Sequence, residues 1–427
     1  MRRLLFLLVP RLLSGMLLSG MLLSGQPAKD SCIECHTLMD GPIQRPALLI
    51  KDDVHIANGL SCADCHGGDR TNDDPTVAMS KAKGFVGKPS RMAIPQFCAK
   101  CHSDPNFMRR FRPQERVDQL ELYKTSVHGK RLAAGDENVA TCVDCHSVHD
   151  IRAVNDPLAP VYPPHIPDTC GRCHADAKKM AQYGIPTNQL AQYRTSVHWD
   201  ALKRGDFSAP QCASCHGNHG AKPPQAESVA AVCGTCHVLF EQLYLKSPHQ
   251  PIFSAAGGGG GCIVCHSNHG IQQPSTAMLV GPTAVCSQCH EPSTPGGNAA
   301  GKIAGWIDTL GASLKHSEEV LGSAEKYGME VSEAQAKLAD GREDLVKARL
   351  AMHSFHPEEM HQPIEAGMAI AGDTLRAGQD ALKEKDSRRF GLAISAVFIA
   401  ITVLAIWLLI RRLESDGSGY QAAPPQN

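Results

Sequence analysis

The pattern Cys-x-x-Cys-His occurs nine times between residues 32 and 290, and these nine copies use all 18 cysteines of the chain. We call each copy a pentad and name it by its first cysteine. Zinc ribbons, disulfide pairs and thioredoxin-like sites also use paired cysteines, but they do not require a histidine after the second cysteine every time. A pentad of this kind attaches a haem: its cysteines form thioether bonds, and its histidine binds the iron from one face.

Each pentad therefore predicts one covalently bound c-type haem, which gives nine haems and their irons as the cofactors. Residues 32–290 are too few to build a conventional hydrophobic core around nine macrocycles, so we expect the haems to touch one another. The cysteines predicted to carry the thioether bonds are Cys32, Cys35, Cys62, Cys65, Cys98, Cys101, Cys142, Cys145, Cys170, Cys173, Cys212, Cys215, Cys233, Cys236, Cys262, Cys265, Cys286 and Cys289. The pentad histidines predicted to bind iron are His36, His66, His102, His146, His174, His216, His237, His266 and His290.

A repeat of two pentads occurs three times from Cys98 onward. In each repeat a Tyr-x-x-Ser-x-His motif, which we call the lead-in, precedes the second pentad, and a tail histidine follows that pentad by three residues. The six haems of these repeats are thus matched by six further histidines, which predicts bis-histidine coordination. These are His128, His149, His198, His219, His249 and His269. For any one of them, a surface histidine or one that hydrogen-bonds a propionate is the alternative.

Three pentads remain outside these repeats, and their irons need other histidines as second ligands. His55 lies seven residues before Cys62 and is predicted to serve one further iron. Two irons are then short of a second ligand, and the remaining histidines are His165, His316, His353, His356 and His361. We favour His353, because a cysteine-free segment has reason to follow nine haems if it covers or ligates one. His356, one helical turn away, is the alternative, as is a His353 that is only packed at an interface.

The sequences at both ends of the chain predict that the protein is exported and anchored to a membrane. Residues 1–28 combine a basic start, an apolar run and small residues, which predicts a secretory signal peptide, with a membrane anchor as the alternative. Residues 390–410 are 21 residues without a charge, the length of one transmembrane helix. Arg411 and Arg412 follow, which predicts that residues 411–427 are a cytoplasmic tail. The haem domain would then lie on the exported, periplasmic side of the cytoplasmic membrane.

Residues 296–389 have a different composition and predict a helical domain. Ile303, Ile307, Leu310 and Leu314 recur at helical spacing, and Pro357 ends a second apolar segment, so we expect a helical hairpin or small bundle. The predicted fold is therefore mainly α-helical with much irregular loop. It comprises a haem-packed domain over residues 29–295, the helical domain, and one transmembrane helix.

The pentads, the lead-ins and the His-x-x-His tail at residues 146–149 resemble those of exported, membrane-anchored multihaem c-type cytochromes with doubled Cys-x-x-Cys-His motifs. The resemblance covers about residues 30–290. It implies covalent c haems, low-potential electron transfer, and membrane-linked anaerobic, metal or nitrogen respiration. Lys347–Phe355 also resembles the helical tail of some membrane-anchored members, in which a histidine at the position of His353 approaches a haem.

Three functions fit these features. The first is an electron-transfer relay between a quinol-linked membrane donor and periplasmic or extracellular acceptors. Its partners would be a quinol-oxidising membrane complex, other cytochromes or a terminal reductase, and it needs no catalytic residue. The second is an enzyme that acts on a small nitrogen or sulfur compound at a five-coordinate haem, for which the pentads at Cys32, Cys62 and Cys286 are candidates. The third is a quinol-docking membrane subunit. No basic stripe accompanies the formal charge of −1, so nucleic acid is not an expected partner.

Overall fold

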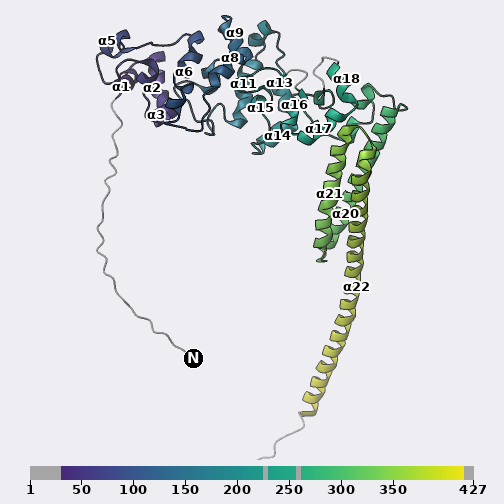
Figure 1. Cartoon of the computed structure of the whole chain (residues 1–427). Helices are drawn as coiled ribbons and strands as arrows, with labels where there is room; N and C mark the ends of the chain where they lie inside the picture. The colour runs from purple at the N-terminus through teal and green to yellow at the C-terminus, as the bar shows by residue number, and fades with distance from the viewer. Residues whose placement is uncertain (1–29, 225–228, 256–260, 418–427) are drawn as a thin grey trace, which may run out of the picture. The chain divides into compact units, whose positions relative to one another are not determined.

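A computed structural model describes residues 30–224, 229–255 and 261–417, and these residues form α-helices and 3-10 helices without a β-strand (Figure 1). The prediction of a mainly helical chain with much loop is confirmed. The chain forms two compact units, Met1–His165 and Ile166–Asn427. Their boundary lies inside residues 29–295, the region predicted as the haem-bearing domain. The predicted signal peptide, residues 1–28, falls outside the described residues.

The first unit consists of short helices joined by loops. Its 3-10 helices are η1 (Gly41–Ile43), η2 (Ile50–Asp52), η3 (Lys81–Lys83), η4 (Arg91–Ala93) and η5 (Pro163–His165). Its α-helices are α1 (Ser31–Thr37), α2 (Gln44–Leu49), α3 (Val54–Ala57), α4 (Cys62–His66), α5 (Pro75–Ala78), α6 (Ile94–His102), α7 (Pro105–Met108), α8 (Gln119–Thr125), α9 (Val127–Ala133) and α10 (Cys142–His146).

The second unit begins with similar short helices and ends with three long ones. Its 3-10 helices are η6 (Ala181–Tyr183), η8 (Thr276–Met278), η9 (Cys286–Gln288) and η10 (Met352–Ser354). The short α-helices are α11 (Ile166–His174), α12 (Ala177–Met180), α13 (Gln189–Tyr193), α14 (Val197–Lys203), α15 (Cys212–His216), α16 (Val229–Gly234), α17 (Val238–Lys246), α18 (His249–Ala255) and α19 (Cys262–His266). The long ones are α20 (Pro295–Lys326), α21 (Ser332–Ala351) and α22 (Glu358–Gly417).

Four pentads each form a five-residue helix of their own: α4, α10, α15 and α19. In α4 and α10 a capping box starts the helix at the first cysteine, because Ser61 or Thr141 and the aspartate three residues later satisfy the free amide groups. Each of the four helices ends in a residue with positive φ, at Gly67, Ser147, Gly217 and Ser267. Serine rarely adopts this conformation, so its recurrence shows that the chain must reverse directly after the pentad histidine.

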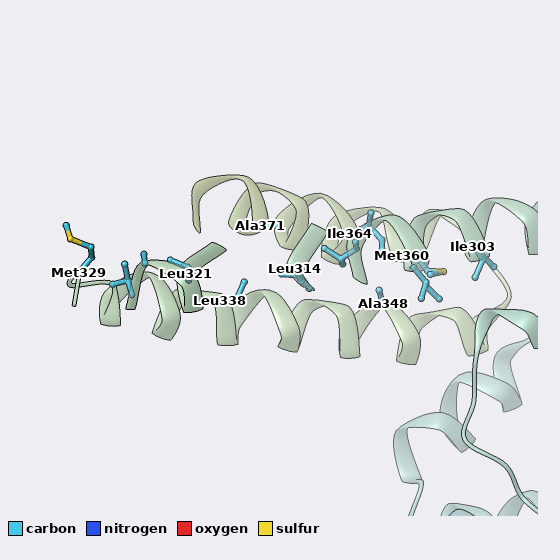
Figure 2. Close-up of a cluster of buried hydrophobic side chains, with 13 residues drawn as sticks. Ile303, Leu314, Leu321, Met329, Leu338, Ala348, Met360, Ile364 and Ala371 are labelled. Atoms are coloured by element: carbon cyan, nitrogen blue, oxygen red, sulfur yellow. The ribbon is translucent and has the colours of Figure 1, made fainter. Parts of the chain in front are cut away.

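The three long helices form a bundle around a conventional hydrophobic core (Figure 2). Leu310, Leu314 and Leu321 of α20 are almost fully buried there, together with Ala348 of α21 and Met360 of α22. The helical spacing seen in the sequence therefore does produce one buried face. A Cβ atom at Gly341 would lie 2.7 Å from Leu314 Cδ2, so glycine allows α21 to approach α20 closely at this point.

The last helix, α22, extends well beyond the bundle (Figure 1). Its first part packs on α20 and α21, and the Ser317 hydroxyl of α20 donates a hydrogen bond of 2.8 Å to the Ala371 carbonyl of α22. Residues 390–410 in its later part are exposed and carry no charged side chain. Among the described helices, α22 is long and apolar enough to cross a membrane.

Candidate haem sites

Six pairs of histidine rings stand at nearly the same separation, with ring centroids 6.0 to 6.4 Å apart. Each pair joins one pentad histidine to one histidine outside the pentads. In the first unit the pairs are His102 with His55 and His66 with His149. In the second unit they are His237 with His198, His216 with His269, His290 with His249, and His266 with His353.

This separation is the one that a metal ion between two imidazoles requires. Bonds of about 2 Å from the metal to each nitrogen place the two ring centroids roughly 6 Å apart. Unrelated histidine contacts would not repeat one distance six times, nor would each select one pentad histidine and one other. The residues therefore fit bis-histidine haem sites, with the pentad cysteines placed to hold each macrocycle.

The histidines outside the pentads do not pair with the pentad nearest to them in sequence. They follow a fixed order along the chain, which we call the register. A lead-in histidine faces the pentad that comes after the nearest one: His198 precedes Cys212 but faces His237, and His249 precedes Cys262 but faces His290. His55 behaves in the same way, because it precedes Cys62 and faces His102.

A tail histidine faces a pentad that lies earlier in the chain. His149 faces His66, and His269 faces His216. The ring planes in these two pairs are 24° and 17° apart, so the rings are nearly parallel. The planes of the lead-in pairs cross at 32° to 82°. The two classes of ligand thus give two classes of geometry.

In each compact unit, a backbone hydrogen bond joins the segment of a lead-in histidine to the segment of a tail histidine. In the first unit the Val54 amide, next to His55, donates to the carbonyl of Ile151, two residues after His149, at 2.7 Å. In the second unit Val197, next to His198, makes the same bond to Ile271, two residues after His269, at 2.9 Å. The repeat therefore places a lead-in and a tail histidine side by side, each aimed at a different pentad.

His353 occupies the position of a tail histidine, although it comes from the helical bundle. Its ring lies 6.1 Å from that of His266, with the planes 16° apart. The Phe240 ring of α17 meets it edge-on at 4.8 Å. Two residues later, the Phe355 ring packs against His249 at 4.1 Å. The turn between α21 and α22 therefore inserts one side chain into each of two neighbouring sites.

Backbone carbonyls fix the orientation of several of these rings. The Nδ1 atoms of His66, His216 and His353 lie 2.8 to 3.2 Å from the carbonyl oxygens of Gly87, Lys222 and Arg349, respectively. A ring that donates through Nδ1 keeps its Nε2 lone pair for a metal. Burial lowers the pKa of the imidazoles of His149, His174, His198, His249, His266, His269 and His353, which favours the neutral form that binds iron.

His55 is positioned by a carboxylate that the sequence analysis did not single out. Asp53 Oδ1 accepts from His55 Nδ1 at 2.8 Å, and Asp53 Oδ2 accepts from the Ile151 amide at 2.8 Å. Burial by itself raises the pKa of Asp53, but the hydrogen bonds from His55 and Ile151 outweigh it and lower that pKa. An aspartate two residues before a predicted ligand was the available signal for this role.

The tyrosine and the serine of the lead-in motif each make a hydrogen bond that holds the local structure. The hydroxyl of Tyr123 donates to the Ala140 carbonyl, and that of Tyr193 to the Pro210 carbonyl, both at 2.8 Å. Each carbonyl lies two residues before a pentad cysteine, so the tyrosine anchors the pentad. The serine caps the next helix: Ser126 Oγ accepts from the Gly129 amide at 2.8 Å. That helix carries the lead-in histidine in its first turn.

Hydrogen bonds and electrostatic interactions between cysteines indicate which pentads are neighbours. Two examples are the hydrogen-bonded thiols of Cys98 and Cys142 and those of Cys233 and Cys262. In the first unit the interacting cysteines link the pentads at Cys32, Cys62, Cys98 and Cys142 in that sequence. In the second unit they link those at Cys170, Cys212, Cys233, Cys262 and Cys286. Each unit thus holds its pentads as a row.

Five predicted ligands do not belong to the six pairs: His36, His128, His146, His174 and His219. His128 has the register of His198 and His249, and His219 has that of His149 and His269. Their roles, and the thioether bonds of all 18 cysteines, remain predictions.

One glycine that sequence patterns did not reveal also shapes a site. Gly296, in the first turn of α20, packs so closely on His290 that a Cβ atom there would lie 2.3 Å from His290 Nδ1. The bundle therefore contacts the sites at its start through Gly296 and at its α21–α22 turn through His353 and Phe355.

Comparison with known families agrees with this geometry. The model of a family described as cytochrome c3 matches residues 54–175 and 206–291. The chain is a multihaem c-type cytochrome. Covalently bound c-type haems are therefore its cofactors, and electron transfer is its role. No solved structure matches this cytochrome.

Replacing His353 with alanine tests the pair that links the bundle to the haem region. We expect the H353A cytochrome to keep its full number of haems, because the pentad at Cys262 is unchanged. One iron should become high-spin and bind one additional equivalent of carbon monoxide after reduction. Absorption spectra of the reduced protein, with and without carbon monoxide, measure this change.

His356 provides the matched control. It lies in the same turn, but its side chain is exposed. The H356A spectrum should therefore equal that of the unmodified cytochrome. If H353A left the spectrum unchanged, His353 would be packed beside the haem rather than bound to iron.

Proposed function

We propose that the chain is a nine-haem electron-transfer relay, anchored to the cytoplasmic membrane, with its haem region on the exported side. It passes electrons from a quinol-linked donor in the membrane to periplasmic or extracellular acceptors in respiration. The observation that carries this proposal is the row of neighbouring pentads in each unit. Reversible electron transfer is the chemistry that c-type haems supply when bound.

The histidine pairs favour a relay over catalysis at these sites. In each of the six pairs the second imidazole takes the coordination position that a substrate would need. Hydrogen bonds at Nδ1 orient the rings of His55, His66, His216 and His353, so these ligands need not rearrange when the oxidation state changes. Such sites suit electron transfer between surfaces rather than the binding of a small molecule.

Two features of α22 support a single membrane crossing. Residues 390–410 lack charged side chains, and Arg411 and Arg412 follow on the side proposed to be cytoplasmic. Before that segment, Arg388 pairs with Glu384 one turn away, which reduces the cost of a charge near the membrane surface.

The length of α22 limits which electron donor can reach the sites beside the bundle. Met360 is buried in the bundle core, and Phe390 begins the apolar segment 30 residues later in one continuous helix. At about 1.5 Å per residue, the turn that holds His353 would stand roughly 45 Å above the membrane with α22 along the membrane normal. A quinol in the bilayer would not reach His266 or His353 from there, so we propose that a redox protein delivers the electrons.

Intact mass and a redox titration test the nine-haem relay. The mass of the mature chain should exceed that of the processed polypeptide by nine haem units, and the oxidised protein should take up nine electrons. Both measurements depend on every pentad being occupied. Eight or fewer haems in fully matured protein would show that at least one pentad has another role.

A truncation after Asp386 tests the anchor. This position follows the bundle, whose packed residues extend to Leu382, so the haem region and the bundle should stay intact. We expect the truncated protein to move from the membrane fraction to the soluble periplasmic fraction, with an unchanged haem spectrum. Retention in the membrane would instead identify an uncleaved anchor within residues 1–28.

A further inference from the structure

The first pentad, Cys32–His36, has no partner under the register that governs the other sites. A lead-in histidine faces the second pentad after it, as His198 does for His237 and His249 does for His290. His55 precedes Cys62 and faces His102, so this register also begins at the amino-terminal end of the first unit. A tail histidine follows the second pentad after the one it faces, as His149 does for His66, but the tail position for His36, three residues after His102, is Pro105. Residues 1–31 hold no histidine at a lead-in position for His36.

The contacts of His36 agree with this register. Its Nδ1 atom lies 3.2 Å from the Ile43 carbonyl, which leaves Nε2 to bind iron, as in the paired sites. All 21 histidines of the chain lie in the described residues, and within these residues no imidazole ring is paired with that of His36. The pentads at Cys62 and Cys286 seemed equally open from sequence, but His149 and His249 close them.

His165 is the histidine of the first unit that belongs neither to a pentad nor to a lead-in or tail position, and its ring contacts Tyr162 rather than His36. His165 Nδ1 lies 3.0 Å from the Ala159 carbonyl, and its ring meets Tyr162 edge-on at 5.9 Å. By contrast, Leu38 directly after α1, Ile43 of η1 and Leu48 of α2 expose between 49% and 87% of their surface. The segment that carries His36 is therefore open to solvent beside these side chains, and a small molecule can approach it.

We propose that the haem attached at Cys32 and Cys35 has an open coordination position and binds a small neutral molecule with a donor lone pair, such as a diatomic gas, when reduced. This inference rests on haem attachment at this pentad, which the proposed function also requires. Cys32 interacts with Cys62, so the open site adjoins the row of pentads in the first unit. The row can therefore deliver electrons to this site.

Carbon monoxide binding by the purified holoprotein tests the proposal, because carbon monoxide binds open ferrous haem and leaves bis-histidine haems alone. We expect one equivalent per chain after reduction. The double variant C32A/C35A should lose one haem by mass and all carbon monoxide binding. The matched control C286A/C289A should also lose one haem but keep the full equivalent, because His249 closes the site that is lost and His353 closes the site at Cys262.

Two results would overturn the proposal. One is an unmodified protein that binds no carbon monoxide; if the H165A variant then binds one equivalent, His165 is the ligand that closes the site. The other is carbon monoxide binding that survives in C32A/C35A, which would place the open haem elsewhere. The haem count by mass separates these results from a failure of the nine-haem relay itself, since it is measured independently of ligand binding.

Discussion

The pairing of two imidazoles from distant parts of the chain, which would hold one haem iron between them, is the constraint on which the haem-bearing regions depend. The helices there have four to nine residues, and helices so short are not stable alone in water. A ligated pair such as His66 and His149 closes a long loop, and cross-links that close loops reduce the entropy of the unfolded chain. Covalent attachment at the pentad cysteines makes each such link permanent on one side.

The bundle is stabilised in a different way, and one turn connects the two. Its core of leucine, isoleucine, alanine and methionine side chains is buried in the ordinary hydrophobic manner. At the turn between α21 and α22, His353 pairs with His266 and Phe355 packs on His249. Residues 390–410, the proposed membrane anchor, belong to the same helix α22 that packs in the bundle, so one continuous helix joins the bundle to the anchor.

Sequence patterns predicted the kind of site but not its partners. The pentads, the lead-ins and the apolar spacing of α20 are local signals, and they gave the ligand types and the bundle. The pairing is long-range: His55 lies closest in sequence to Cys62, yet Asp53 and the bond from Val54 to Ile151 turn it toward His102. Spacing alone contains no information on that turn. His353 was proposed from its place in the chain, and the structure shows His266 as its partner.

The central claim is that a histidine from a distant part of the chain ligates each paired iron. A cryo-electron microscopy map of the intact holoprotein measures this most directly. The account predicts continuous density from His102 through an iron to His55, and from His266 through an iron to His353. Density that instead joined His55 to the iron at His66, or that left His353 clear of the iron at His266, would contradict it.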